Sequence, residues 1–200
     1  VNGRLADRVV READRLGHID DDLLNLSLIE AQEAPTRVPV PIHLLVQEAV
    51  EHVRVAATAR SIPIEFTAGR QPLTVVCDHR QVVSAVTNLL DNAVKYSEAG
   101  RPVLVSTEAD GSTASVVVRD QGVGIPSRDL ERIFERFYRV DQARSRATGG
   151  TGLGLSIVRH VAQAHGGEVT VESREGEGSV FRLVLPMAGS RAESSVREAS

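Results

Sequence analysis

Three polar side chains recur at helical spacing within a largely apolar stretch, Asn88 to Ser97. Asn88, Asn92 and Lys95 stand at positions i, i+4 and i+7, which places them on one face of a helix. An amide oxygen is a hard ligand suited to Mg2+, and an ammonium group attracts phosphate oxygens. The strip therefore indicates a site for a metal ion with a polyphosphate, although a solvated polar face would give the same pattern.

Asp120 opens a glycine-containing turn, DQGVGIP, directly after a predicted strand. Gly122 and Gly124 allow backbone turns, and a close approach by a ligand, that a side chain would prevent. Asp120 could accept a hydrogen bond from a buried donor, and such a bond to a charged acceptor contributes about 1.5–3 kcal/mol. Considered alone, the segment is better explained by an ordinary β-turn.

A second glycine segment, GGTGLGL, opens a predicted helix from about Gly152 to His165. Backbone N–H groups at a helix N-terminus that glycines precede form a phosphate-binding site. The segment is neither a P-loop nor a Rossmann fingerprint. The polar residues Asp141 to Thr148 before it predict a mobile lid. Ordering them would cost about 1–2 kcal/mol per residue, so we expect closure to depend on bound nucleotide.

Between the two glycine segments lies Leu130 to Arg139, LERIFERFYR. Phe134, Phe137 and Tyr138 predict an aromatic patch that anchors a short helix. Arg139 stands at the edge of the predicted lid, from which a guanidinium group can reach a terminal phosphate.

The elements that must position these segments follow from the periodicity of apolar residues. A helix is expected over Ile42 to Arg60, and Asp78 is a suitable N-cap for the helix that carries the polar strip to about Tyr96. Strands are expected at Ile62 to Thr67, Leu73 to Cys77, Val103 to Glu108, Ala114 to Arg119, Glu168 to Ser173 and Val180 to Leu185. This order predicts an α+β two-layer sandwich, in which helices cover one face of a mixed, largely antiparallel sheet.

The regions on either side have a different character. Residues 5–34 predict one long amphipathic helix whose apolar seam needs a partner helix. The expected organisation is this helical part at 1–34, a proline-marked linker at 35–41, the main domain at 42–187 and a disordered tail at 188–200.

Composition excludes several classes of function. The net charge of -4 over 200 residues gives no support to nucleic-acid binding. Cys77 is the only cysteine, which rules out an intrachain disulfide or a multi-cysteine zinc site. No apolar run approaches the roughly 18 residues that span a bilayer. We expect a cytoplasmic chain, either free or as the cytoplasmic part of a membrane-anchored sensor.

The four segments together, in this order, resemble the N, G1, F and G2 boxes of the ATP-binding catalytic domain of bacterial sensor histidine kinases. The superfamily is shared with gyrase, Hsp90 and MutL, and the resemblance extends from about Leu5 to Pro186. It implies bound ATP and Mg2+. The positions that it assigns to the nucleotide are Asn88, Asn92, Lys95, Tyr96, Asp120, Gly122, Gly124, Ile125, Arg139, Gly150, Thr151, Gly152, Leu153 and Gly154.

The resemblance also implies individual roles. Asn92 would ligate Mg2+ with Asn88 beside it, Lys95 would contact phosphate, and Tyr96 would pack on the base. Asp120 would bind the adenine amino group in a pocket that the neighbouring glycines shape. Residues 150–154 would hold the phosphates under the lid. Asn88 and Arg139 are the two positions expected to assist catalysis, Arg139 at the γ-phosphate.

The N-terminal helix resembles the second helix of the family's dimerisation hairpin. It predicts a homodimer, or a heterodimer with an intact kinase, and the family implies a response regulator receiver domain as partner. The first hairpin helix, with the acceptor histidine, is not expected in this chain, and His18 lies in what matches the second helix. The remaining histidines are expected to be structural or surface residues. ATP binding without autophosphorylation is therefore predicted. The segment ARSRATGGTGLGL further resembles kinases of the phosphate-sensing type.

Three other interpretations compete with this one. An anti-sigma-factor serine kinase shares the ATP fold, but the dimerisation-like helix and the aromatic segment argue against it. A gyrase- or MutL-like ATPase would have a glutamate in place of Asn88 as general base for water. The third is a truncated, nucleotide-binding modulator that dimerises with intact kinases.

Overall fold

A computed structural model of the chain describes residues 36–69, 71–140 and 150–189. The predicted N-terminal helix, the predicted lid at 141–148 and most of the predicted tail lie outside these residues. Among the helices that are described, none is long and apolar enough to cross a membrane.

A five-stranded sheet forms one layer of the molecule. Its strands in spatial order are β2 (Ile64–Thr67), β4 (Val103–Asp110), β5 (Thr113–Arg119), β7 (Gly178–Pro186) and β6 (Glu168–Arg174). Only β2 and β4 run parallel, and the other three pairs are antiparallel. The predicted mixed, largely antiparallel sheet is confirmed.

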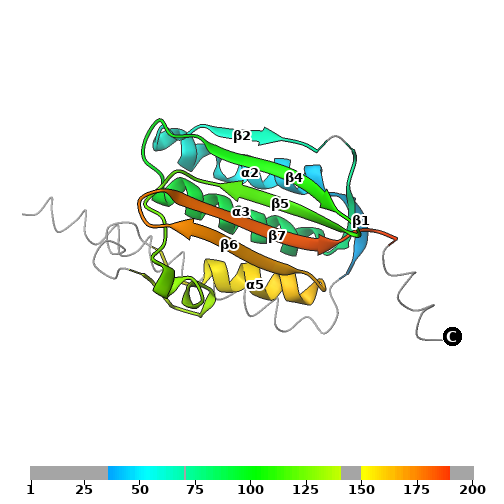
Figure 1. The fold of residues 1–200 in the computed structure, drawn as a ribbon. Coiled ribbons are helices and arrows are strands. Elements are labelled where there is room, and N and C mark those ends of the chain that lie inside the picture. Colours follow the sequence, from blue (N-terminus) through cyan, green and yellow to red (C-terminus); the bar gives the residue numbers. More distant parts are fainter. Residues whose placement is uncertain (1–35, 70, 141–149, 190–200) are drawn as a thin grey trace, which may run out of the picture.

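Three helices form the second layer and cover one face of the sheet (Figure 1): α2 (Ile42–Ala59), α3 (His79–Tyr96) and α5 (Gly154–Ala164). Their apolar residues meet those of the central strands in one continuous core, as an amphipathic helix requires. In β5, Ala114, Val116 and Val118 alternate toward the helices and are completely buried. The α+β sandwich that the sequence predicts is therefore confirmed.

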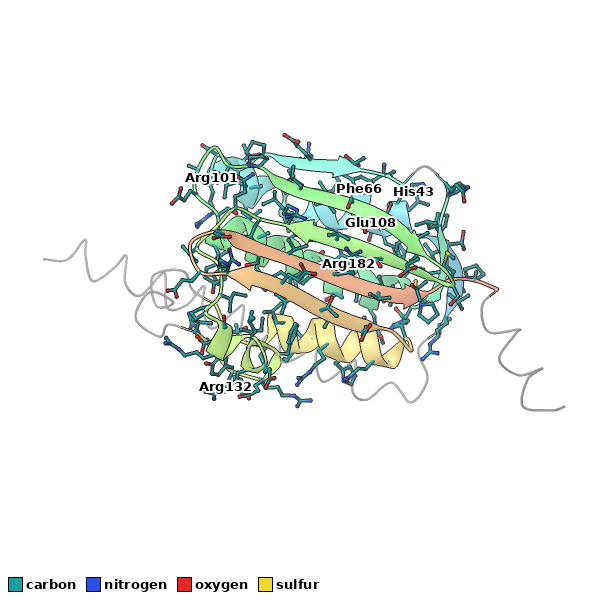
Figure 2. All side chains as sticks on the ribbon, viewed as in Figure 1. His43, Phe66, Arg101, Glu108, Arg132 and Arg182 are labelled. Atoms are coloured by element: carbon teal, nitrogen blue, oxygen red, sulfur yellow. The ribbon has the colours of Figure 1, made fainter. Side chains whose placement is uncertain are left out.

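The opposite face of the sheet is not covered by any described helix. Glu108 of β4 and Arg182 of β7 lie on it, 2.7 Å apart across the intervening β5 (Figure 2). The guanidinium group of Arg182 donates to the carboxylate of Glu108 and lowers its pKa. Polar residues on one face and apolar residues on the other are typical of an antiparallel sheet with a single helical layer.

One segment that the sequence assigns to the linker forms a strand instead. Val38–Pro41 is β1, which pairs antiparallel with β3 (Thr74–Cys77) in a separate two-stranded sheet. Proline is tolerated in an edge strand because the side of the residue that lacks an N–H can face solvent and not a neighbouring strand. The C-terminal end of the domain also reaches β3, because Met187 forms an isolated antiparallel β-bridge with Val75.

The segment Leu130 to Arg139 also differs from its prediction. In place of a short α-helix, it contains one 3-10 turn, η2 (Arg132–Phe134), which follows another, η1 (Ser127–Asp129). A hydrogen bond of 2.6 Å from the hydroxyl of Tyr138 to the buried carboxylate of Asp129 ties the residues after η2 back to η1. Ile133 and Phe134 enter the core. The aromatic anchor is therefore smaller than predicted, because Phe137 is 62% exposed.

Candidate functional site

Helix α3 carries the polar strip, and its two faces explain why the strip lies where it does. Asp78 is the N-cap, as predicted, and accepts a hydrogen bond of 3.1 Å from the N–H of Gln81. The apolar residues of α3 are buried against α2, α5 and the sheet. Asn88, Asn92 and Lys95 remain half-buried along the other face. Packing of the apolar face therefore fixes the direction in which the polar strip points.

Asn88 meets the beginning of helix α5. Its amide nitrogen donates to the carbonyl of Ser84 at 2.9 Å, which directs the amide oxygen away from α3. A methyl group added at Gly154 would lie only 2.6 Å from that oxygen. Glycine at this position therefore lets α5 begin directly beside the amide oxygen of Asn88.

The N-terminus of α5 has the character of an anion site. No side chain caps it, and its first turn contains no acidic residue. The loop before it is shaped by its own contacts, with the hydroxyl of Thr151 accepting from the N–H of Leu153 at 3.1 Å. Because α5 is longer than two turns, its N-terminal N–H groups and its dipole favour a negatively charged group there.

Two cationic groups converge on the loop before α5. A methyl group added at Gly150 would lie 2.5 Å from the ammonium nitrogen of Lys95 and 4.0 Å from the guanidinium of Arg139. Lys95 is the chain's only lysine, and its ammonium lies 5.8 Å from the centre of the Tyr96 ring. The predicted phosphate-binding residues of three separate segments are thus brought together.

Phe137 supports this loop through its backbone. Its N–H donates to the carbonyl of Gly152 at 2.9 Å, and both residues have positive φ angles of 63° and 78°. A methyl group at Gly152 would collide with the backbone of Phe137 at 2.8 Å. A bulky residue rarely adopts the left-handed region, so the backbone of Phe137 is strained. Its close packing against the backbone of Gly152 holds it in that conformation.

Asp120 lies near Tyr96, beyond the last turn of α3, and is 6% exposed. Its carboxylate accepts hydrogen bonds from the N–H of Gly122 at 2.8 Å and from the N–H of Ser179 at 3.2 Å. Burial raises the pKa of this carboxyl group, and these hydrogen bonds oppose that shift. The contribution of Ser179 was not predicted, because it stands 59 residues further along the chain.

The glycines after Asp120 bring its turn against α3 and against the β6–β7 turn. A methyl group at Gly122 would lie 2.3 Å from the carbonyl oxygen of Tyr96, and one at Gly124 would lie 2.0 Å from that of Arg174. Gly124 also has a φ of 65°, which glycine adopts without strain. Ile125 is held by its N–H, which donates to the hydroxyl of Ser173 at 2.8 Å. The turn is therefore fixed beside Tyr96.

The site as a whole has a buried carboxylate near the last turn of α3 and an uncapped helix N-terminus beside Asn88. Asp120 lies beside the backbone carbonyl of Tyr96, and Lys95 of the same turn reaches the loop before α5, near Arg139. Within the described ranges, no three histidine, cysteine or acidic side chains cluster as metal ligands would. The donors available to a cation are the amides of Asn88 and Asn92, which fit Mg2+ that shares its coordination with phosphate oxygens and water.

Comparisons with known proteins agree with this geometry. Residues 77–189 match the family described as histidine kinase-, DNA gyrase B-, and HSP90-like ATPase. The sensor-like histidine kinase SenX3 of Mycobacterium tuberculosis (strain ATCC 25618 / H37Rv) is 43% identical over 184 residues, which cover 92% of this chain and 45% of SenX3. The sensor histidine kinase WalK of Bacillus subtilis (strain 168) is 33% identical over 180 residues, 88% of this chain and 29% of WalK. The chain thus spans less than half the length of these relatives.

Solved structures show the same fold. The mycobacterial sensor histidine kinase MprB superposes with a TM-score of 0.66 at 34% identity, over 76% of this chain and 97% of the MprB chain. Full-length ShkA in complex with AMPPNP superposes with a TM-score of 0.76 at 30% identity, over 94% of this chain and 39% of ShkA. The chain belongs to the sensor histidine kinases, and residues 77–189 carry their ATP-binding catalytic domain.

Proposed function

We propose that this chain binds ATP with Mg2+ and donates the γ-phosphoryl group to a histidine nitrogen, for relay to a response regulator. The observation that carries the proposal is the pairing of a buried carboxylate, Asp120, with an uncapped helix N-terminus at opposite ends of one polar strip. The carboxylate suits the amino group of adenine, and the helix terminus suits the phosphates.

The phosphate end has the parts that phosphoryl transfer needs. Asn92, with Asn88 beside it, would hold Mg2+ against the phosphates, and Lys95 and Arg139 would neutralise their charge. Residues 150–154 would hold the phosphates by backbone N–H groups. When bound, Mg2+ supplies charge neutralisation at the phosphate oxygens. The acceptor nitrogen forms the new P–N bond as the bond from the γ-phosphorus to the bridging oxygen breaks and ADP leaves.

Transfer to a histidine is favoured over hydrolysis by the residue at position 88. Asn88 carries an amide, which cannot take a proton from water as a carboxylate can. We further propose that the acceptor histidine lies outside residues 36–189 and that residues 1–34 dimerise. His165, for example, is buried and accepts a hydrogen bond from the N–H of Asp78 at 3.0 Å, so it cannot meet a phosphate.

The proposal is tested first by calorimetry of ATP binding with Mg2+. Asp120→Asn removes the charged acceptor, and we expect about a tenfold to hundredfold loss of affinity. The matched control is Asp110→Asn, the same change at an exposed position at the end of β4. Asn92→Ala is expected to abolish the dependence of binding on Mg2+. Unchanged affinity in Asp120→Asn would remove the adenine role, and unchanged Mg2+ dependence in Asn92→Ala would remove the metal role.

Phosphotransfer is tested with labelled ATP. The 200-residue chain alone is expected to bind ATP and to gain no acid-labile phosphate. When full-length SenX3 with a disabled ATP site is added, we expect acid-labile phosphate on SenX3, because the two chains are 43% identical. Acid-labile phosphate on the chain alone would contradict the predicted absence of the acceptor. A lack of transfer in the presence of a paired partner would favour a nucleotide-binding modulator.

A further inference from the structure

The end of α3 that bears Lys95 and Tyr96 is held by a residue outside every motif discussed above. A helix leaves its last four carbonyl groups without partners inside the helix, and these groups must be satisfied from elsewhere. In α3 each of the four has a donor. The carbonyl of Ala93 accepts from the N–H of Ser97 at 3.1 Å, and that of Tyr96 accepts from the N–H of Val123 at 3.3 Å. The two carbonyls between them, of Val94 and Lys95, accept from the side chain of Arg60 at 3.1 Å and 2.8 Å.

Arg60 therefore satisfies two of the four carbonyls with one side chain. Its Nε donates to the carbonyl of Val94 and its Nη2 to that of Lys95. The planar guanidinium presents these donors in a fixed fork, which a lysine ammonium cannot reproduce. Its positive charge also lies at the negative end of the α3 dipole. The contact thus fixes both the position and the direction of the last turn of α3.

The backbone at Arg60 is itself rigidly built. Arg60 is the C-cap of α2, and Ser61 after it has a left-handed φ of 56°. The N–H of Ser61 donates to Thr58 at 3.0 Å and the N–H of Ile62 to Ala57 at 2.9 Å, which is the Schellman pattern. Since Ile62 and Ala57 are both buried, the cap holds Arg60 at a set point over the end of α3.

We propose that Arg60 is a positioning residue for nucleotide binding, which acts through the last turn of α3 on Lys95 and Tyr96. Lys95 projects to the loop at Gly150, and the backbone carbonyl of Tyr96 lies against Gly122. A shift of that turn moves the phosphate contact and the base contact together. The inference rests on the proposed function for the roles of Lys95 and Tyr96, and it adds a residue that touches neither nucleotide nor metal.

The test measures affinity for ATP with Mg2+ by calorimetry, and the melting temperature, on the full 200-residue chain. For Arg60→Ala we expect about a tenfold loss of ATP affinity, because two charge-assisted hydrogen bonds are removed. The matched control is Arg54→Ala on the same helix, which removes an exposed arginine paired with Glu51 at 3.0 Å and should leave the affinity unchanged. Arg60→Lys separates charge from geometry. It keeps the positive charge and the melting temperature and is expected to lose most of the affinity.

A double-mutant cycle with Lys95→Ala identifies the path of the effect. If Arg60 acts through the end of α3, Arg60→Ala in the Lys95→Ala background should cost clearly less than it does in the wild type. Full ATP affinity in Arg60→Ala or in Arg60→Lys would overturn the proposal, and so would losses that simply multiply in the double variant. Lys95→Ala alone tests the phosphate role of Lys95, so that a failure of the proposed function is recognised separately.

Discussion

Replacing Gly154 by alanine should disable the site without unfolding the protein. The added methyl would lie 2.6 Å from the amide oxygen of Asn88, while ordinary contact requires at least 3.4 Å. The oxygen must therefore retreat, and rotation of the Asn88 side chain sacrifices its hydrogen bond to Ser84. That bond contributes about 0.5–1.5 kcal/mol to stability. Gly154 is the first residue of α5, so the gain from alanine stays below the roughly 0.5–1 kcal/mol of a mid-helix position and offsets only part of this loss.

The cost to binding is larger than the cost to folding. If the Asn88 oxygen serves the metal ion, its loss removes a charge-assisted interaction worth about 1.5–3 kcal/mol, or roughly tenfold to a hundredfold in affinity. Calorimetry with ATP and Mg2+ measures the affinity, and thermal unfolding without nucleotide measures the stability. We expect the affinity to fall and the melting temperature to change little.

Two further variants make the result decisive. Gly111→Ala changes a glycine in the β4–β5 turn that has open space around it but a φ of 55°, so it should lower the melting temperature and still bind ATP normally. Asn88→Ala should itself weaken binding, and adding Gly154→Ala to it should cost little more, because the colliding oxygen is already gone. Wild-type affinity in Gly154→Ala would refute the role that we assign to the contact between α3 and α5.

Three other predictions follow from single groups. Burial lowers the pKa of His165 below its ordinary 6.5, so the free energy of unfolding should fall as the pH drops through 6.5 toward the folded-state pKa. Denaturant titrations should show this dependence reduced in His165→Gln, and an equal dependence would contradict it. Burial raises the pKa of Cys77 to about 11, so a thiol reagent at pH 8 should label it only at the rate of unfolding; fast labelling of the native chain would oppose this. Ser61→Gly removes the strain of a non-glycine residue with a left-handed φ, which should stabilise the folded state by roughly 1 kcal/mol. We expect the melting temperature to rise by about 2–4 °C, and a decrease would show that Ser61 is unstrained.

Much of the fold could be predicted from the sequence, because its elements are specified locally. The N-cap Asp78, the limits of α3 and the order of strands and helices all follow from periodicity and capping, and they agree with the structure to within a few residues. The glycine segments could be located for a similar reason, since a backbone that must approach another backbone closely requires glycine. Gly122 and Gly152 both meet that requirement.

Other features depend on contacts between distant segments, which no local pattern encodes. Arg60 reaches carbonyls 34 and 35 residues away, and Ser179 reaches Asp120 across 59 residues. β1 resembles a linker because prolines dominate it, and only its partner β3 makes it a strand. Phe137 is apolar and resembles a core residue in the sequence. In the structure its backbone N–H donates to the carbonyl of Gly152, and its ring is exposed.

Both ends of the described fold, at β1 and at Ala188, are held by the same strand, β3. β1 pairs with β3 through Pro41 and Thr74, and on the way out of the domain the N–H of Ala188 donates to the carbonyl of Thr74 at 2.8 Å. β3 in turn runs through Asp78 directly into α3. A force applied to the chain before β1 or after Ala188 therefore acts first on β3. From β3 it acts on α3, the helix that carries the polar strip. Entry and exit at one corner make the domain a module that can be tethered at either end with its sheet intact.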